Sequence, residues 1–165
     1  MSKNFDVKKE VVAEIRKKLD RAQSLILVDY KGINVEQATE LRNACRAAGV
    51  DYKVYKNNLV KRAAEGTPFE ALANDLVGPN AFAFGYDDPV KPAKVLKEVS
   101  AKAKALELKS GIVEGTYFDV KGIQEIADLP SREVLIAKLL GSFNAPISNF
   151  AYLIKNIAEK KEQQA

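Results

Sequence analysis

The segment Asp51–Arg62 constrains the fold most, because a strand pattern passes directly into a helix pattern within it. Its first residues alternate, which places Tyr52 and Val54 on one side of a short strand. A polar turn follows, and either Asn57 or Asn58 is suited to cap the next helix. Strands that lead straight into helices are typical of α/β folds, so this fold class is predicted.

Cationic side chains gather around this polar turn. Lys61 and Arg62 lie in the first turns of the predicted helix, where positive charge opposes the helix dipole instead of complementing it. With Lys53, Lys56 and the free amides at the helix start, they form a corner suited to the phosphates of a polyanion. The alternative is that these side chains form an ordinary solvated face.

The distribution of charge along the chain favours a phosphate-binding site over an ordinary solvated face. The formal net charge is +4. Residues 1–66 hold 14 Lys and Arg against 9 Asp and Glu, whereas residues 67–165 hold 12 against 13. This asymmetry points to an anionic partner for the N-terminal part of the chain.

Composition argues against several classes of protein. The chain has no His, which removes the commonest general base and metal ligand, and it has no glycine-rich phosphate loop or zinc spacing. Its single Cys45 excludes an internal disulfide and lies in a predicted apolar helix stripe. We therefore expect a non-enzymatic protein with no cofactor and no metal.

The start of the chain lacks an apolar signal segment. The longest aliphatic run, Leu25–Val28, is far shorter than a membrane span. These features predict a soluble, cytoplasmic protein with no membrane partner.

A second strand-to-helix junction lies at Tyr30–Gly32. It follows the apolar run Ser24–Val28, and Asn34 is suited to cap a helix that carries Arg42 and Arg46 on one face. If the two predicted strands are adjacent and parallel in an open sheet, both junctions emerge at the same edge and form one basic surface. Within it Tyr30 could stack on a base, or it could be a half-buried turn tyrosine.

Other patterns complete the predicted architecture. Two further strands are expected, Asn80–Tyr86 and a segment through Leu106, Leu108 and Ile112. The expected helices are an amphipathic helix at Phe5–Ala22, a short helix near Phe69–Leu76, a long helix beginning at Asp87, and a short helix at Val120–Ala127. The cations of the first helix could contact RNA or could be solvated, and solvation is favoured for those paired in sequence with Glu10, Glu14 and Asp20.

The C-terminal segment predicts a separate helix. Ser131 is a suitable N-cap, and Pro146 would either begin the apolar part or kink it. Its apolar residues recur at heptad-like spacing, namely Phe143, Ile147, Phe150, Ile154 and Ile157. Such a helix either folds back on the sheet or binds partner helices. We expect an α/β domain over 1–130 and a helical unit over 131–165.

Four ordered motifs resemble one family over essentially the full length of the chain. They are Asp29–Gly32, Lys56–Leu59, Gly78–Ala81 and Leu129–Glu133. The chain resembles bacterial large-subunit ribosomal protein number ten, the protein at the base of the ribosomal stalk. The resemblance implies a sandwich-like α/β domain on large-subunit rRNA beside the eleventh large-subunit protein. It also implies a C-terminal amphipathic spine helix that carries dimers of the acidic stalk protein, which recruits GTP-bound translation factors.

The family's motifs assign roles to single residues. Its Tyr-Arg/Lys-Gly loop falls on residues 30–32, and its Lys-Asn-Thr turn falls on residues 56–58, where Asn58 replaces the usual Thr. The expected RNA-binding residues are Tyr30, Lys31, Gly32, Arg42, Arg46, Lys53, Lys56, Asn57, Asn58, Lys61 and Arg62. The expected partner-binding residues are Phe143, Ile147, Phe150, Ile154 and Ile157. Since Phe143–Lys161 spans only about 28 Å at 1.5 Å per residue, two stalk dimers are expected rather than three.

Two other classes of function stay open from the residues alone. A small α/β enzyme or nucleotide-binding domain is disfavoured by the missing His and phosphate loop. A membrane-surface protein is disfavoured because the terminal helix has few cations before Lys155.

Overall fold

Five strands form one sheet in the order β2-β3-β1-β4-β5, and every neighbouring pair is antiparallel. The computed structural model describes residues 3–102 and 106–163. The strands are β1 (Ser24–Asp29), β2 (Asp51–Val54), β3 (Asn80–Gly85), β4 (Glu107–Val113) and β5 (Thr116–Asp119). The chain divides into two compact units, Met1–Leu129 and Pro130–Ala165, and the sheet belongs to the first.

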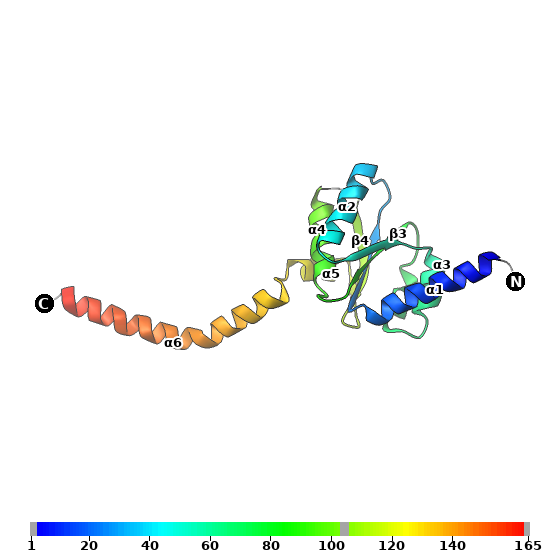
Figure 1. Cartoon of the computed structure of the whole chain (residues 1–165). Helices are drawn as coiled ribbons and strands as arrows, with labels where there is room; N and C mark the ends of the chain where they lie inside the picture. The colour runs from blue at the N-terminus through cyan, green and yellow to red at the C-terminus, as the bar shows by residue number, and fades with distance from the viewer. Residues whose placement is uncertain (1–2, 103–105, 164–165) are drawn as a thin grey trace. The chain divides into compact units, whose positions relative to one another are not determined.

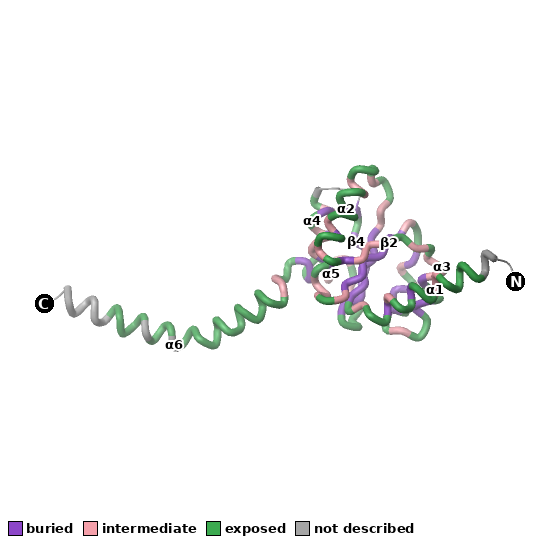
Figure 2. The backbone as a smooth tube through the Cα atoms, in the orientation of Figure 1, coloured by how far each residue is buried: buried purple, intermediate pink, exposed green. Residues whose placement is uncertain are grey.

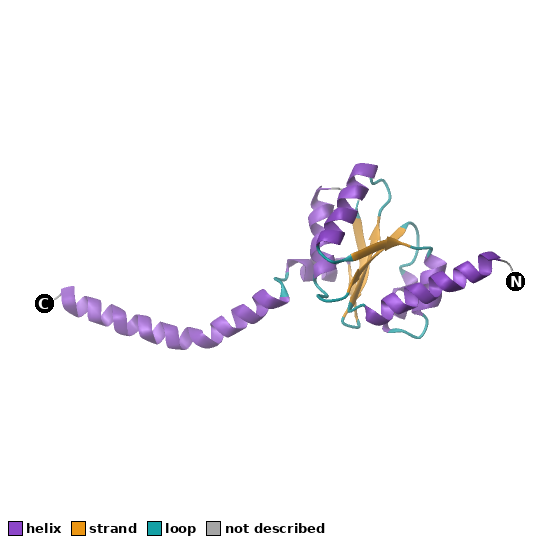
Figure 3. Cartoon of the chain, viewed as in Figure 1, coloured by secondary structure: helices purple, strands orange, loops and turns teal. Residues whose placement is uncertain are grey.

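Helices cover both faces of this sheet (Figures 1 and 3). One face packs against α1 (Lys3–Arg21), α3 (Asn57–Ala64) and the 3₁₀ helix η1 (Pro68–Asn74). The other face packs against α2 (Val35–Ala47), α4 (Lys91–Lys102) and α5 (Val120–Asp128). The first unit is therefore a three-layer α/β arrangement, and the predicted fold class is confirmed.

The central strands are buried on both faces, as Figure 2 shows. In β3, Phe82 and Phe84 enter the core beneath α1 and α3, whereas Ala83 enters the core beneath α2 and α4. Large side chains thus fill one layer while small ones let helices approach the other. The prediction that Asn80–Tyr86 is a strand buried on both sides is confirmed in its essentials.

The order of the strands corrects one prediction. We expected β1 and β2 to be adjacent and parallel, but β3 lies between them and runs antiparallel to both. The physical reason lies in their side chains: β3 is buried throughout and needs a neighbour on each side, whereas β2 exposes Lys53 and Val54 and suits an edge.

Helix boundaries were predicted less accurately than helix existence. The helix expected to begin at Asp87 begins at Lys91, because the Asp88 carboxylate accepts a hydrogen bond from the Val90 amide in a turn. Val35 is 83% exposed at the start of α2, while Cys45 is buried, as its place in an apolar stripe predicted. Burial raises the pKa of the Cys45 thiol to about 11.

A β-bulge interrupts the pairing of β1 with β4. Leu27 pairs with Ser110 and Val28 pairs with Leu108, so Lys109 has no partner in the register. A bulge turns the extra side chain away from the regular alternation of the strand. This change of direction brings the Lys109 ammonium group to the end of the sheet.

The second unit is one helix, α6 (Arg132–Gln163), with Pro146 inside it. Figure 1 shows that α6 bends along its length, which is expected where a proline removes a backbone donor. Phe143, Phe150 and Ile154 are 69%, 65% and 52% exposed. The side chains of Ile147 and Ile157 lie outside the described residues. Exposed apolar side chains extend beyond the predicted seam, to Val134, Leu135, Ile136, Leu139, Leu140, Tyr152 and Leu153.

Candidate nucleic-acid interface

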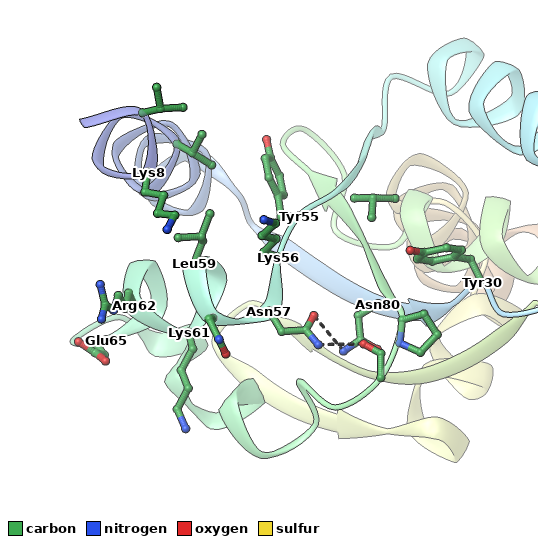
Figure 4. Close-up of a pocket in the computed structure, with 16 residues that line it drawn as sticks. Lys8, Tyr30, Tyr55, Lys56, Asn57, Leu59, Lys61, Arg62, Glu65 and Asn80 are labelled. Atoms are coloured by element: carbon green, nitrogen blue, oxygen red, sulfur yellow. Dashed lines mark hydrogen bonds between the residues drawn. The ribbon is translucent and has the colours of Figure 1, made fainter. Parts of the chain in front are cut away.

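An open groove of about 1310 Å³ lies where α1 and α3 meet one end of the sheet (Figure 4). We call it the basic groove. Four cationic side chains line it, Lys8, Lys56, Lys61 and Arg62, together with one carboxylate, Glu65. All five are exposed. An excess of cations around a concave surface attracts anionic ligands.

Six of the predicted RNA-binding residues line the basic groove: Tyr30, Lys56, Asn57, Asn58, Lys61 and Arg62. Lys31 and Gly32 follow Tyr30 in an exposed loop. Both junctions reach the groove because β1 and β2 run in the same direction, each antiparallel to β3. Asp29 pairs with Asn80 and Val54 pairs with Ala81, so both strands end at the start of β3. The two loops therefore meet at one end of the sheet, although an intervening strand separates them.

Asn57 connects the start of α3 to the loop before β3. Its Nδ2 donates a hydrogen bond to the Gly78 carbonyl at 2.8 Å, and its Oδ1 accepts one from Asn80 at 3.5 Å (Figure 4). The prediction that Asn57 or Asn58 caps this helix is wrong, because both lie inside α3. The N-cap is Lys56, whose backbone carbonyl accepts from the Leu59 and Val60 amides.

Lys109 joins three segments at this end of the sheet. Its ammonium group donates to the Val77 carbonyl at 2.9 Å and to Asn80 Oδ1 at 2.9 Å, and it forms an ion pair with Asp29 Oδ2 at 3.0 Å. We call these contacts the Lys109 clamp. Because Asn80 also contacts Asn57, the clamp connects the ends of β1, β3 and β4 with the start of α3. Lys109 was not among the residues predicted from the sequence, because its contacts depend on the register shift between β1 and β4.

Asp29 shapes the 30–32 loop as well. Its Oδ1 accepts a hydrogen bond from the Lys31 amide at 2.9 Å, and Gly32 adopts a φ of +87°, which disfavours side chains. Burial disfavours the charged carboxylate, but the hydrogen bonds from the Lys31 amide and from Lys109 outweigh it and hold the pKa of Asp29 below its usual value. Asp29 therefore stays ionised and paired with Lys109.

Lys53 lies apart from the basic groove. Its ammonium group pairs with Glu14 of α1 at 3.0 Å, and the Tyr55 hydroxyl donates to the same carboxylate oxygen at 3.0 Å. These two hydrogen bonds lower the pKa of Glu14, and a neighbouring ion pair joins Lys18 to Asp51. In this arrangement Lys53 connects β2 to α1.

Arg42 and Arg46 are exposed on α2, in the layer on the other face of the sheet. The chain runs along α2 away from the 30–32 loop, so at 1.5 Å per residue Arg46 is about 17 Å from Val35 along the helix. The structure therefore does not bring these two arginines into the basic groove.

Within residues 3–102 and 106–163, no group of three His, Cys, Asp or Glu side chains could hold a metal ion. The same part of the chain contains no helix with the length and apolarity that crossing a membrane requires.

Replacing Lys109 by Met should lower the free energy of unfolding by about 1–3 kcal/mol, because Asp29 and Asn80 lose a charged partner in a half-buried setting. Denaturant unfolding measures this change. Lys121→Met, an exposed lysine on α5, is the matched control and should be near neutral. Equal stability of both variants would show that the clamp contributes nothing.

The Asp29–Lys109 pair also predicts a pH dependence. Because the folded pKa of Asp29 is lowered, its contribution is complete above the ordinary value of 3.8 and is lost as pH falls through the folded pKa. Wild type should be more stable than Asp29→Asn at neutral pH, and the difference should vanish in strong acid. Unfolding curves across the acid range test this, and a constant difference would contradict it.

Comparisons with known proteins point to a single family. The family model described as "Ribosomal protein L10" matches residues 3–101, and the model described as "Ribosomal protein uL10 C-terminal region" matches residues 129–164. Three similar relatives are each named "Large ribosomal subunit protein uL10". The protein of Alkaliphilus oremlandii is 58% identical over 99% of this chain and 98% of its own length. That of Clostridioides difficile is 56% identical with the same coverage, and that of Bacillus licheniformis is 47% identical over 99% of each chain.

These matches cover both units of the structure and confirm the resemblance drawn from the four motifs. The chain therefore belongs to the ribosomal protein L10 (uL10) family and is a structural, non-enzymatic protein of the large ribosomal subunit.

Proposed function

We propose that this chain forms the base of the ribosomal stalk in the bacterial cytoplasm and joins large-subunit rRNA to protein partners. Residues 1–130 bind the rRNA, beside the eleventh large-subunit protein. Residues 131–165 anchor dimers of the acidic stalk protein, and these dimers recruit GTP-bound translation factors. The short length of the C-terminal helix favours two dimers. The function requires no cofactor and no metal.

The observation that carries RNA binding is the basic groove. Lys8 comes from α1, Lys56 from the loop between β2 and α3, and Lys61 and Arg62 from α3, yet all line one concave surface with a single carboxylate. Cations gathered in this way cost stability through mutual repulsion unless an anionic partner neutralises them. Backbone phosphates of a folded RNA supply such charge at regular spacing.

Some of the predicted RNA-binding residues do not line this groove, and each group of them would contact RNA in a different way. Lys31 and Gly32 follow the groove residue Tyr30 in the exposed 30–32 loop. Lys53 can contact a phosphate only by exchanging its partner Glu14. Arg42 and Arg46 lie in the other layer and would contact a separate segment of the RNA.

The exposed apolar side chains of α6 support the anchoring role. Phe143, Phe150 and Ile154 leave more than half of their surface accessible, and Ile147 and Ile157 continue the heptad spacing in the sequence. A helix with such a seam is stabilised when other helices cover it.

The RNA-binding proposal predicts a change in salt dependence. Each phosphate contact contributes about one unit to the slope of log affinity against log salt concentration. Lys56→Ala and Lys61→Ala should each flatten this slope in filter binding to a transcript of large-subunit rRNA. Lys121→Ala, which removes the same charge from α5, is the control. Slopes equal to wild type in both groove variants would show that the groove is ordinary surface.

The anchoring proposal predicts a separate loss. Ile154→Asp places a charge in the apolar seam and should abolish co-purification of the acidic stalk protein while RNA binding is retained. Asn156→Asp adds the same charge to another face of α6 and should leave co-purification unchanged. Retention of the stalk protein by Ile154→Asp would place the binding surface elsewhere.

A further inference from the structure

We propose that the basic groove binds an unpaired nucleotide of RNA, with its base against apolar side chains of the groove and its phosphate against the cations. This inference rests on the proposed RNA binding and adds the kind of RNA structure recognised. It distinguishes a loop or bulge nucleotide from the regular phosphate backbone of a duplex.

The apolar part of the groove motivates the proposal. Val7 of α1 and Val54 of β2 line it and are 56% and 47% exposed. Val11 of α1 and Leu59 of α3 also line the groove; both are half-buried and pack against the core on this face of the sheet. When an unstacked base covers these side chains, apolar surface of both is removed from water, which favours binding. A phosphate group has no apolar surface and is not stabilised in this way.

Cations lie next to these apolar side chains. Figure 4 shows Lys8 of α1 pointing toward Leu59 of α3, with Arg62 on the following turn of the same helix. A nucleotide combines a flat apolar face with an anionic phosphate a few ångströms away. The groove offers the complementary combination within one concavity.

The aromatic and amide residues of the groove fit the same ligand. The Tyr55 ring is held in place by its hydroxyl bond to Glu14 and by tilted and edge contacts with Phe82 and Phe84. Tyr30 lines the groove half-buried and provides a ring on which a base can stack. Exposed Asn58 supplies an amide that can hydrogen-bond a base edge.

These features favour an unpaired nucleotide over the two other candidate ligands. A paired A-form helix hides its base faces in the stack and presents phosphates and 2′-hydroxyls. An acidic protein helix would need a continuous apolar strip, whereas amide side chains at Asn57 and Asn58 interrupt the apolar lining here.

The test is chemical probing of large-subunit rRNA bound to the full chain. Dimethyl sulfate and a carbodiimide report protection of base edges, and hydroxyl radicals report protection of the backbone. The test variant is Val7→Ser with Val54→Ser, both exposed enough to leave the fold intact, which thermal unfolding verifies. Val35→Ser, 83% exposed on α2 and outside the groove, is the matched control.

We expect wild type and Val35→Ser to protect at least one unpaired base. The double variant should lose that protection, bind about tenfold more weakly, and keep both its backbone protection and its salt slope. Base protection that persists in the double variant, or protection of backbone alone in wild type, would overturn this inference while RNA binding stands. Absence of all protection in wild type would instead overturn the proposed RNA binding.

Discussion

The ion pair between Lys109 and Asp29 is the interaction on which the candidate site depends. A β-bulge in β4 releases Lys109 from the regular alternation of the strand, and its ammonium group then reaches the end of β1 and the loop before β3. The register shift and the contacts of Lys109 thus occur at the same residue of β4.

The same polar contacts reach the helix that carries two cations of the groove. Asn80 accepts a hydrogen bond from Lys109 and donates one to Asn57, so the start of α3 is joined to the sheet by side chains. Lys61 and Arg62 lie in the last turn of the short helix α3 (Asn57–Ala64), where positive charge complements the helix dipole. The expectation that these cations oppose the dipole was wrong, because the helix is only eight residues long and ends two residues after Arg62.

The sequence predicted the elements and the residues of the groove better than their arrangement. Strand and helix patterns identified β1, β3 and α2, and basic residues after β2 identified Lys56 and Lys61. The order of the strands was not predictable from those patterns. The patterns of β1 and β2 are compatible both with adjacent pairing and with another strand between them. The role of Lys109 was not predicted because it depends on a one-residue bulge. Such a bulge cannot be recognised from the alternation of apolar and polar residues in the sequence. Sequence alone also does not show Glu14 beside Lys53, the partner that a phosphate would have to replace.

The most direct measurement is a cryo-electron microscopy structure of the large ribosomal subunit that contains this chain. We expect rRNA phosphates within hydrogen-bond distance of Lys56 and Lys61, with the Lys109–Asp29 pair intact beneath them. A structure in which the groove faces solvent while rRNA contacts only α2 would contradict the account.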